Sequence, residues 1–337
     1  MLASHLHCVS YRESRPELAS APRAALPGHA LIGRLAMGHD AWLGAGSVIR
    51  ADGHFVRIGN ALHLGRGATV HIAHDLYPTL IGDRAVIGTN TVVHACTLGD
   101  DVVVEDDSVI LDGSVLGAGA VIEAGSIVFP RSLLEAGMLY AGRPARVVRA
   151  LAPGEGRARA DQQRRRNEAG AVDWPCRPVA ARAAPDCFVA DTACLAGEVQ
   201  MAAGSSVWYG CRLEAGKAPI TIGVRCNVQD NSVLRAGVGG VSLGAETTIG
   251  HNVFLEDCKV GARCLVGIGS RIAPGTTIAD DAFVAAGAVT EPGQHLQGGL
   301  IWGGKPARPL GPLDNAKRAM ILRTAQVYQG YAQALGQ

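Results

Sequence analysis

Two histidines at related places in the chain are the first candidates for chemistry. His94 lies in the stretch IGDRAVIGTNTVVHAC at residues 81–96, and His251 lies in LGAETTIGHNVFLEDC at residues 243–258. The two stretches align without a gap at an offset of 162 residues. A neutral imidazole can bind a transition metal or act as a general base. An ordinary surface or hydrogen-bonded histidine is the alternative at each position.

The elements that must position these histidines have an unusual period. An apolar residue recurs every six residues, in one run at Leu98, Val104, Ile110, Leu116, Ile122 and Val128 and in another at Val260, Val266, Ile272, Ile278 and Val284. This period suits neither an amphipathic helix nor a flat sheet. It is typical of a parallel β-helix of hexapeptide turns, in which the apolar residue points inward and a small residue takes the corner. The step shortens once to five residues in each half, from Val93 to Leu98 and from Leu255 to Val260, and this shared irregularity favours a tandem duplication.

The pattern divides the chain into five parts. We predict an N-terminal arm at 1–30, a first β-helix at 31–155, a helical, charged linker at 156–172, a second β-helix at 173–311 and a C-terminal helix at 312–337. The Arg-rich stretch around residues 164–166 is expected to be a solvated helix face.

Composition agrees with a solenoid and excludes several classes of protein. Hydrophobic residues make up 48% of the chain, but aromatic residues only 4%, and there are 44 glycines. The net charge of +1 predicts no nucleic-acid partner, and no apolar run is long enough to cross a membrane. The nine cysteines include no C-x-x-C pair, which argues against a cysteine zinc site. The N-terminus lacks an apolar signal sequence, so we expect a cytoplasmic protein.

Short motifs in both halves point to a family. They are VIRAD, TVH, VVHAC and GRPAR in the first half, and SSVWYG, NVQD, TIGHNV and GGKPAR in the second. With these motifs the sequence resembles the gamma-class carbonic anhydrase-like family, in tandem. The resemblance implies an all-β solenoid of two left-handed parallel β-helix domains, each followed by an α-helix. Members carry three histidines that bind zinc, iron or cobalt between neighbouring subunits of a trimer, and the metal lowers the pKa of its water to about 7.

Carried over residue by residue, the ligand set is divided between the halves. His71 and His94 match the first and third ligands, and His251 matches the second. The three vacated ligand places hold Thr89 in the first half and Arg235 and Glu256 in the second. Together the halves contain one complete set.

The supporting residues of the family are divided in the same way. The Arg-x-Asp pair survives as Arg50 and Asp52, while Glu214 and Gly216 occupy its places in the second half. The Asn-x-Gln-Asp motif survives in the second half as Asn227, Gln229 and Asp230, opposite His63, Gly65 and Arg66 in the first. The resemblance implies that Gln229 or Asn227 orients the substrate and that Arg50 and Asp52 support the site. Arg50 and Asp52 could equally be a structural ion pair across an interface.

We therefore hypothesise one composite metal site per chain, with His71 and His94 from a first-half domain and His251 from a second-half domain. Zn²⁺, or Fe²⁺ or Co²⁺, would carry a hydroxide that attacks CO₂ or another small electrophilic carbon. Arg235 and Glu256 would form a charge pair or a cap in the vacated place. His54, His63 and His74 lie near the same loop as substitute ligands, without support from the register.

Two other functions remain open from the sequence. An acyltransferase on the same β-helix would use His94 or His71 as a general base. A non-catalytic assembly protein with degenerate sites would need neither metal nor base. The expected partners are a small-molecule substrate and copies of the chain in a trimer or pseudo-trimer of β-helix domains, whose ring arrangement the sequence leaves open.

Overall fold

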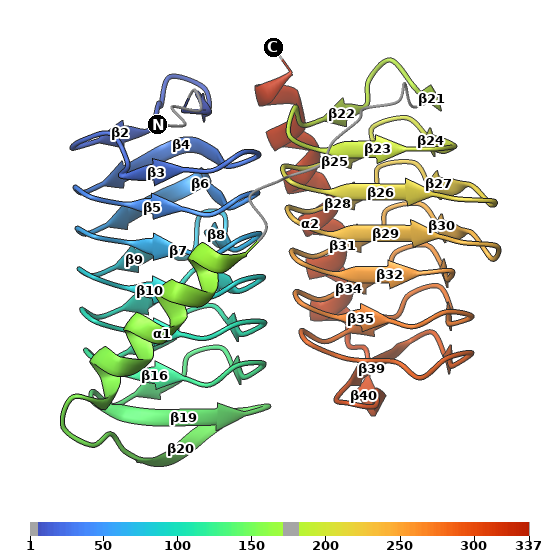
Figure 1. The fold of residues 1–337 in the computed structure, drawn as a ribbon. Helices are drawn as coiled ribbons and strands as arrows, with labels where there is room; N and C mark the ends of the chain where they lie inside the picture. Colours follow the sequence, from blue (N-terminus) through green and yellow to red (C-terminus); the bar gives the residue numbers. More distant parts are fainter. Residues whose placement is uncertain (1–5, 171–181, 337) are drawn as a thin grey trace. The chain divides into compact units, whose positions relative to one another are not determined.

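The chain forms two compact units, each a β-helix with its own α-helix (Figure 1). The computed structural model describes residues 6–170 and 182–336. The first unit spans Met1–Trp174 and the second Pro175–Gln337. Cys176 and the expected domain boundary at 172/173 lie outside the described residues. The prediction of an all-β solenoid with two left-handed parallel β-helix domains, each followed by an α-helix, is confirmed.

Two faces of the first β-helix form one sheet of twelve strands, because the long strand β6 bends around a corner and belongs to both. Its strands are β1 (Cys8–Val9), β2 (Glu17–Leu18), β4 (Ala30–Met37), β6 (Val48–Ile58), β8 (Thr69–His71), β9 (Thr79–Ile81), β11 (Val92–His94), β12 (Thr97–Leu98), β14 (Val109–Ile110), β15 (Val115–Leu116), β17 (Ile127–Val128) and β18 (Leu133–Leu134). The pairings are parallel, as the turns of a β-helix require.

The third face of the first unit is an eight-stranded sheet that ends in an antiparallel hairpin. Its strands are β3 (Ala24–Ala25), β5 (Trp42–Leu43), β7 (His63–Leu64), β10 (Val86–Ile87), β13 (Val103–Val104), β16 (Val121–Ile122), β19 (Met138–Gly142) and β20 (Ala145–Ala150). The helix α1 (Glu155–Ala169) follows. The expected N-terminal arm contains β1, β2 and β3, which pair with β4 and β5.

The second unit has three separate faces. The first has β21 (Arg182–Ala183), β24 (Val199–Met201), β27 (Ile220–Ile222), β30 (Val241–Leu243), β33 (Lys259–Val260), β36 (Thr277–Ile278) and β38 (His295–Leu296). The second has β22 (Phe188–Val189), β25 (Ser206–Val207), β28 (Asn227–Val228), β31 (Thr248–Ile249), β34 (Leu265–Val266), β37 (Phe283–Val284), β39 (Leu300–Gly303) and β40 (Arg308–Pro312). The third has β23 (Cys194–Ala196), β26 (Arg212–Ala215), β29 (Val233–Ala236), β32 (Phe254–Glu256) and β35 (Arg271–Ile272). The helix α2 (Asn315–Leu335) follows.

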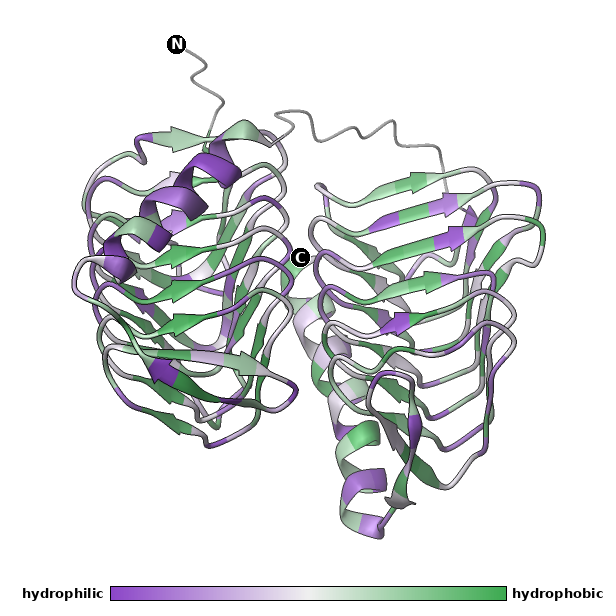
Figure 2. Ribbon diagram, turned by 60° about the horizontal axis from the view of Figure 1, so that its bottom comes forward, coloured by the Kyte–Doolittle hydropathy of each residue, from purple (hydrophilic) through white to green (hydrophobic). Residues whose placement is uncertain are grey.

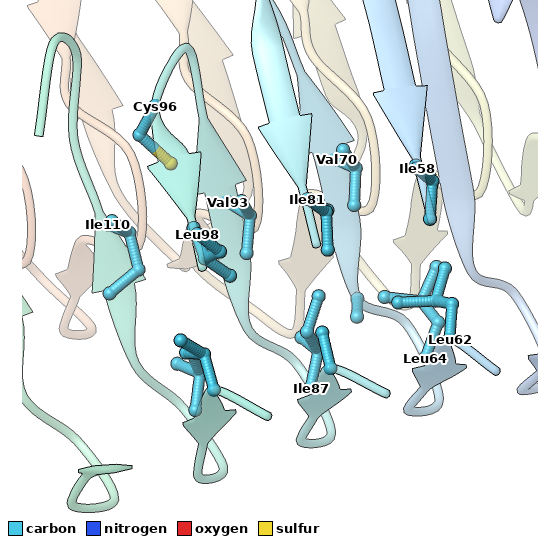
Figure 3. Close-up of a cluster of buried hydrophobic side chains, with 14 of the residues drawn as sticks. Ile58, Leu62, Leu64, Val70, Ile81, Ile87, Val93, Cys96, Leu98 and Ile110 are labelled. Atoms are coloured by element: carbon cyan, nitrogen blue, oxygen red, sulfur yellow. The ribbon is translucent and has the colours of Figure 1, made fainter. Parts of the chain in front are cut away.

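The core of each unit is a column of small and branched side chains inside the coils. Figure 3 shows this column in the first unit, where residues such as Val70, Ile87 and Val93 point into the space that the coils enclose. The six-residue run from Leu98 to Val128 belongs to this core, and the second run from Val260 to Val284 is also buried. The period read from the sequence therefore identifies the inward positions.

Glycine follows many of the inward residues because the coils stack closely. A Cβ atom added to Gly65 would lie 2.5 Å from the backbone of Gly88, and one added to Gly88 would lie 2.5 Å from the backbone nitrogen of Asp106. No side chain larger than hydrogen fits these places without moving the next coil.

Each helix covers one face of its own β-helix. α1 packs on β10 and β13, and α2 packs on β25, β28 and β31. Most residues of α1 are hydrophilic (Figure 2), so polar contacts hold it in place: Gln163 binds the side chain of Asp106, and Asn167 binds the carbonyl of Ile87. Within the described residues, no helix is long and apolar enough to cross a bilayer.

Candidate metal centre

His71 and His94 lie on neighbouring coils of the first unit. β8 and β11 pair in parallel with His71 directly opposite His94. Val70 and Val93 belong to the core, so the alternation of side chains along a strand turns both histidines to the outer side of the same face. The β-helix register therefore places two imidazoles next to each other.

The two rings approach each other through one nitrogen each. His71 Nδ1 is 3.3 Å from His94 Nε2. The remaining nitrogens face carboxylates: His94 Nδ1 is 2.6 Å from Asp112 Oδ1, and His71 Nε2 is 3.3 Å from Asp52 Oδ1. Asp52 in turn forms a buried ion pair with Arg50.

These contacts leave a lone pair on each of the two facing nitrogens. A carboxylate only accepts hydrogen bonds, so the ring N–H of His94 goes to Asp112 and that of His71 goes to Asp52. His71 Nδ1 and His94 Nε2 then both act as acceptors, and two acceptors at 3.3 Å need a cation or a shared proton between them. Two imidazole nitrogens bound to one tetrahedral zinc ion are about 3.3 Å apart, given Zn–N distances of about 2.0–2.1 Å. The pair fits a metal ion.

The third predicted ligand lies in the second unit with the same kind of partner. His251 follows β31, and Asp230 occupies the matching place one coil earlier, after β28. His251 Nδ1 is 3.1 Å from Asp230 Oδ2, while the other oxygen of Asp230 accepts the backbone N–H of Tyr209. Nε2 of His251 is 3.4 Å from the hydroxyl of Tyr328 on α2. All three predicted ligands therefore have a carboxylate on one ring nitrogen, as metal-binding histidines commonly do.

The other predicted site residues lie beside these histidines. In the first unit, Arg50 and Asp52 on β6 contact each other, and Asp52 also contacts His71. In the second unit, Gln229 Nε2 donates to Asn227 Oδ1 at 3.2 Å, and Asn227 Nδ2 donates to Thr248 Oγ1 at 2.8 Å. The predicted set thus forms two groups, one in each unit.

The vacated ligand places in the second unit carry a charge network. Glu214, Arg235 and Glu256 follow one another in register on β26, β29 and β32. Arg235 Nε donates to Glu214 Oε2 at 3.2 Å, and Arg212 pairs with the same carboxylate. Arg235 therefore has Glu214 as its ion-pair partner, where the sequence suggested Glu256.

Thr89 holds the vacated place in the first unit. Its backbone N–H donates to Asp106 Oδ1 at 2.7 Å, and Gln163 of α1 donates to the same oxygen. Thr89 therefore binds the same carboxylate that holds α1 against the β-helix.

The three histidines suggested as substitute ligands, His54, His63 and His74, have different surroundings. His54 Nδ1 accepts its neighbour's backbone N–H at 2.9 Å. His63 is buried against Trp42, with ring centroids 4.2 Å apart. Burial, with smaller effects of Arg164 and Arg23, lowers the pKa of His63 to about 3. His74 has a left-handed backbone in the loop between β8 and β9.

Two neighbours of the histidines were missed from the sequence, Asp112 and Tyr328. At the offset that relates His94 to Glu256, Asp112 corresponds to Pro274, so the carboxylate occurs only in the half that has the histidine. That comparison could have found Asp112. Tyr328 carried no such signal, because its place depends on how α2 packs.

Cys96 and Cys258, which the sequence places at equivalent corners, are buried free thiols. Burial is the main cause that raises the pKa of both. Such protonated thiols act as small hydrophobic residues, as the sequence indicated, and not as nucleophiles or metal ligands.

Comparison with known proteins finds similarity to carbonic anhydrases and to hexapeptide-repeat transferases. A family model described as "Hexapeptide repeat of succinyl-transferase" matches residues 78–110 and 258–290. Gamma carbonic anhydrase 1, mitochondrial, of Arabidopsis thaliana is 34% identical over 156 residues, which cover 44% of this chain and 57% of that protein. A carbonic anhydrase of Geobacillus kaustophilus is 31% identical over 100 residues, covering 29% of this chain and 55% of that protein.

Among solved structures, a hexapeptide transferase family protein from Anaplasma phagocytophilum matches with a TM-score of 0.44 and 27% identity, over 45% of this chain and 91% of that one. The chain spans a little under three fifths of the length of the Arabidopsis and Geobacillus relatives.

Proposed function

We propose that this gamma carbonic anhydrase-like hexapeptide-repeat protein is a metal-dependent enzyme with His71, His94 and His251 as its ligands. The observation that carries the proposal is the set of three histidine–carboxylate pairs, together with the two lone-pair nitrogens of His71 and His94 at 3.3 Å. Three imidazoles suit Zn²⁺, and Fe²⁺ or Co²⁺ are alternatives.

The proposed site is composite. The first unit offers two ligands and the second unit one, so a complete set needs one unit of each kind. The two units can come from one chain or from neighbouring chains in a trimer or pseudo-trimer. A homotrimer with separate rings of first units and second units would not bring His251 to His94, and the ligand count therefore favours a mixed arrangement.

The proposed substrate is CO₂ or another small molecule with an electrophilic carbon. The three histidines would hold the metal, and the metal would act as a Lewis acid that makes hydroxide available near neutral pH. The chain itself supplies orientation: Asp52 and Asp112 accept from the outer ring nitrogens of His71 and His94, Asp230 lies against Nδ1 of His251, and Arg50 pairs with Asp52. The amide of Gln229, tethered by Asn227, is the proposed hydrogen-bonding group for the substrate.

The test is metal content per chain, measured by elemental analysis on protein purified without a tag or chelator. We expect about one zinc, iron or cobalt per chain in the wild type, and strongly reduced content in His71→Ala and in His251→Ala. Glu256→Ala is the matched control, because it removes a charged side chain from a vacated ligand place and is expected to leave the metal content unchanged.

Other results of this experiment would contradict the composite site or the metal-dependent enzyme. If His71→Ala abolishes binding and His251→Ala leaves it intact, the composite site is wrong. If no metal binds after reconstitution, turnover of acetyl-CoA would favour the acyltransferase, and its absence the assembly protein. A cytoplasmic location is proposed alongside and is tested by cell fractionation.

A further inference from the structure

We infer that Asp112 is a positioning residue of the metal site, acting through His94. This inference rests on the proposed function, since it concerns how one of the three ligands is held. Asp112 belongs to none of the motifs that carry the family resemblance.

The contact between Asp112 and His94 is the shortest of the three histidine–carboxylate contacts. Asp112 Oδ1 is 2.6 Å from His94 Nδ1, compared with 3.3 Å for Asp52 and His71 and 3.1 Å for Asp230 and His251. A hydrogen bond of this length to a carboxylate is charge-assisted and fixes both the tautomer and the ring plane. It directs the lone pair of His94 Nε2 toward His71.

The backbone explains how Asp112 reaches this place. β11 and β14 are paired, with Val92 opposite Val109 and Val93 opposite Ile110. Asp112 follows β14 at the next corner, where its own carbonyl accepts the N–H of Arg131 and Gly113 N–H donates to the carbonyl of Ala95. These backbone bonds fix the corner without using the carboxylate, so the side chain is not needed to close the turn.

The second unit shows what happens where the ligand is missing. Its counterpart of His94 is Glu256, and its counterpart of Asp112 is Pro274. Pro274 keeps the corner, since its carbonyl accepts the N–H of Gly293, and Gly275 N–H donates to the carbonyl of Asp257. The same corner therefore forms without an acid, which separates the carboxylate from the structure of the turn.

The consequence for the metal follows from the tautomer. Without Asp112, the proton of neutral His94 can move to Nε2, and the ring can rotate; both remove the lone pair from the position that faces His71. Loss of a partner of this kind commonly lowers metal affinity about 10- to 100-fold.

The experiment measures the zinc dissociation constant of the full chain by competition with a chromophoric chelator, and the absorption spectrum of the Co²⁺-substituted protein. Asp112→Ala is expected to bind zinc about 10- to 100-fold more weakly and to give an altered cobalt spectrum. Asp112→Asn keeps an oxygen that accepts from Nδ1, so it is expected to lose less affinity than Asp112→Ala.

Asp100→Ala is the matched control. Asp100 is also a corner aspartate of the first unit, but its carboxylate accepts the backbone N–H of Asp83 and lies near Arg84. Its zinc affinity and cobalt spectrum are expected to equal those of the wild type. Thermal unfolding of all variants by circular dichroism shows that binding is measured on folded protein, and Asp112→Asn serves if Asp112→Ala does not fold.

The outcomes separate this inference from the proposed function. A wild-type chain that binds no zinc or cobalt overturns the metal site and the role of Asp112 with it. A wild type that binds metal while Asp112→Ala and Asp112→Asn bind it equally tightly, with the same cobalt spectrum, overturns only the positioning role. Weaker binding by the alanine variant, partly restored in the asparagine variant, supports it.

Discussion

His63 makes the first unit sensitive to acid. It lies on β7 with an exposed fraction of 1%, and its ring stacks in parallel on Trp42. Within the described residues, neither ring nitrogen has a hydrogen-bond partner. Burial lowers its pKa from 6.5 to about 3, and the positive charges of Arg164 and Arg23 contribute to the shift. The folded state therefore holds His63 in its neutral form.

The size of the effect follows from proton linkage. Between the two pKa values the unfolded chain binds a proton that the folded chain does not, so the stability contribution is present above pH 6.5 and is lost as the pH falls. With a folded pKa of about 3 and an unfolded pKa of 6.5, the loss between pH 7 and pH 5 is about 2 kcal/mol. The upper limit, below pH 3, is about 5 kcal/mol.

His63→Phe tests this value. Phenylalanine keeps the aromatic contact with Trp42, cannot be protonated and leaves no buried nitrogen without a partner. We expect it to stabilise the first unit by about 1–3 kcal/mol at pH 7 and to lose about 2 kcal/mol less than the wild type between pH 7 and pH 5. The assay is urea unfolding at pH 7, 6 and 5, followed by tryptophan fluorescence and circular dichroism.

The difference between wild type and variant isolates His63, because the other titrating groups are common to both. His295→Gln is the control, since His295 is exposed on β38 with a hydrogen bond to Thr277. This variant is expected to keep the wild-type pH dependence. If wild type and His63→Phe lose the same stability from pH 7 to pH 5, the buried neutral histidine is refuted.

Two further predictions concern packing. Gly88→Ala places a Cβ 2.5 Å from the backbone nitrogen of Asp106, and we expect a loss of about 3 kcal/mol in urea unfolding; Gly330→Ala in α2, where nothing lies within 4 Å, should instead gain up to about 1 kcal/mol. Equal effects of the two would contradict the close-stacking argument. Tyr328→Phe removes only the hydroxyl near His251 and should cost less than about 1 kcal/mol, whereas Tyr328→Ala opens a cavity and should cost about 3–5 kcal/mol, both read from thermal unfolding.

The solenoid could be predicted because apolar residues recur at the six-residue period of its turns. Each coil repeats the same inward position, so residues such as Ile110 and Ile272 identify the core without any knowledge of distant contacts. The strands β1, β2 and β3 could not be found in this way. Each has two residues, and the segment around them lacks the six-residue step. Their pairing with β4 and β5 depends on contacts between coils.

The register of the site could also be predicted in part. The pairing of His71 with His94 follows from the coil length once the β-helix is assumed, and so does the match of Arg235 with Glu256. The partner of Arg235 could not, because a long side chain can reach either neighbouring coil, and it pairs with Glu214. Side-chain direction, unlike strand register, is not fixed by a period.

The losses of ligands and carboxylates occur in pairs. In the second unit, the positions equivalent to His94 and Asp112 hold Glu256 and Pro274, so neither the histidine nor the acid is present. In the first unit, the positions equivalent to His251 and Asp230 hold Thr89 and Arg66, so again both are missing.

A carboxylate kept only for the fold of its corner would have no reason to disappear together with the histidine on the next coil. A carboxylate kept for that histidine would. In the case of Asp230 the cost is physical, because its side chain is buried and a buried acid without its imidazole partner is destabilising. The vacated places make other contacts. In the second unit Arg235 pairs with Glu214, and in the first the backbone N–H of Thr89 donates to Asp106, which also binds Gln163 of α1. Each carboxylate is therefore present only in the unit that has its histidine. This is the pattern expected if the histidines and their acids act together in binding a cation.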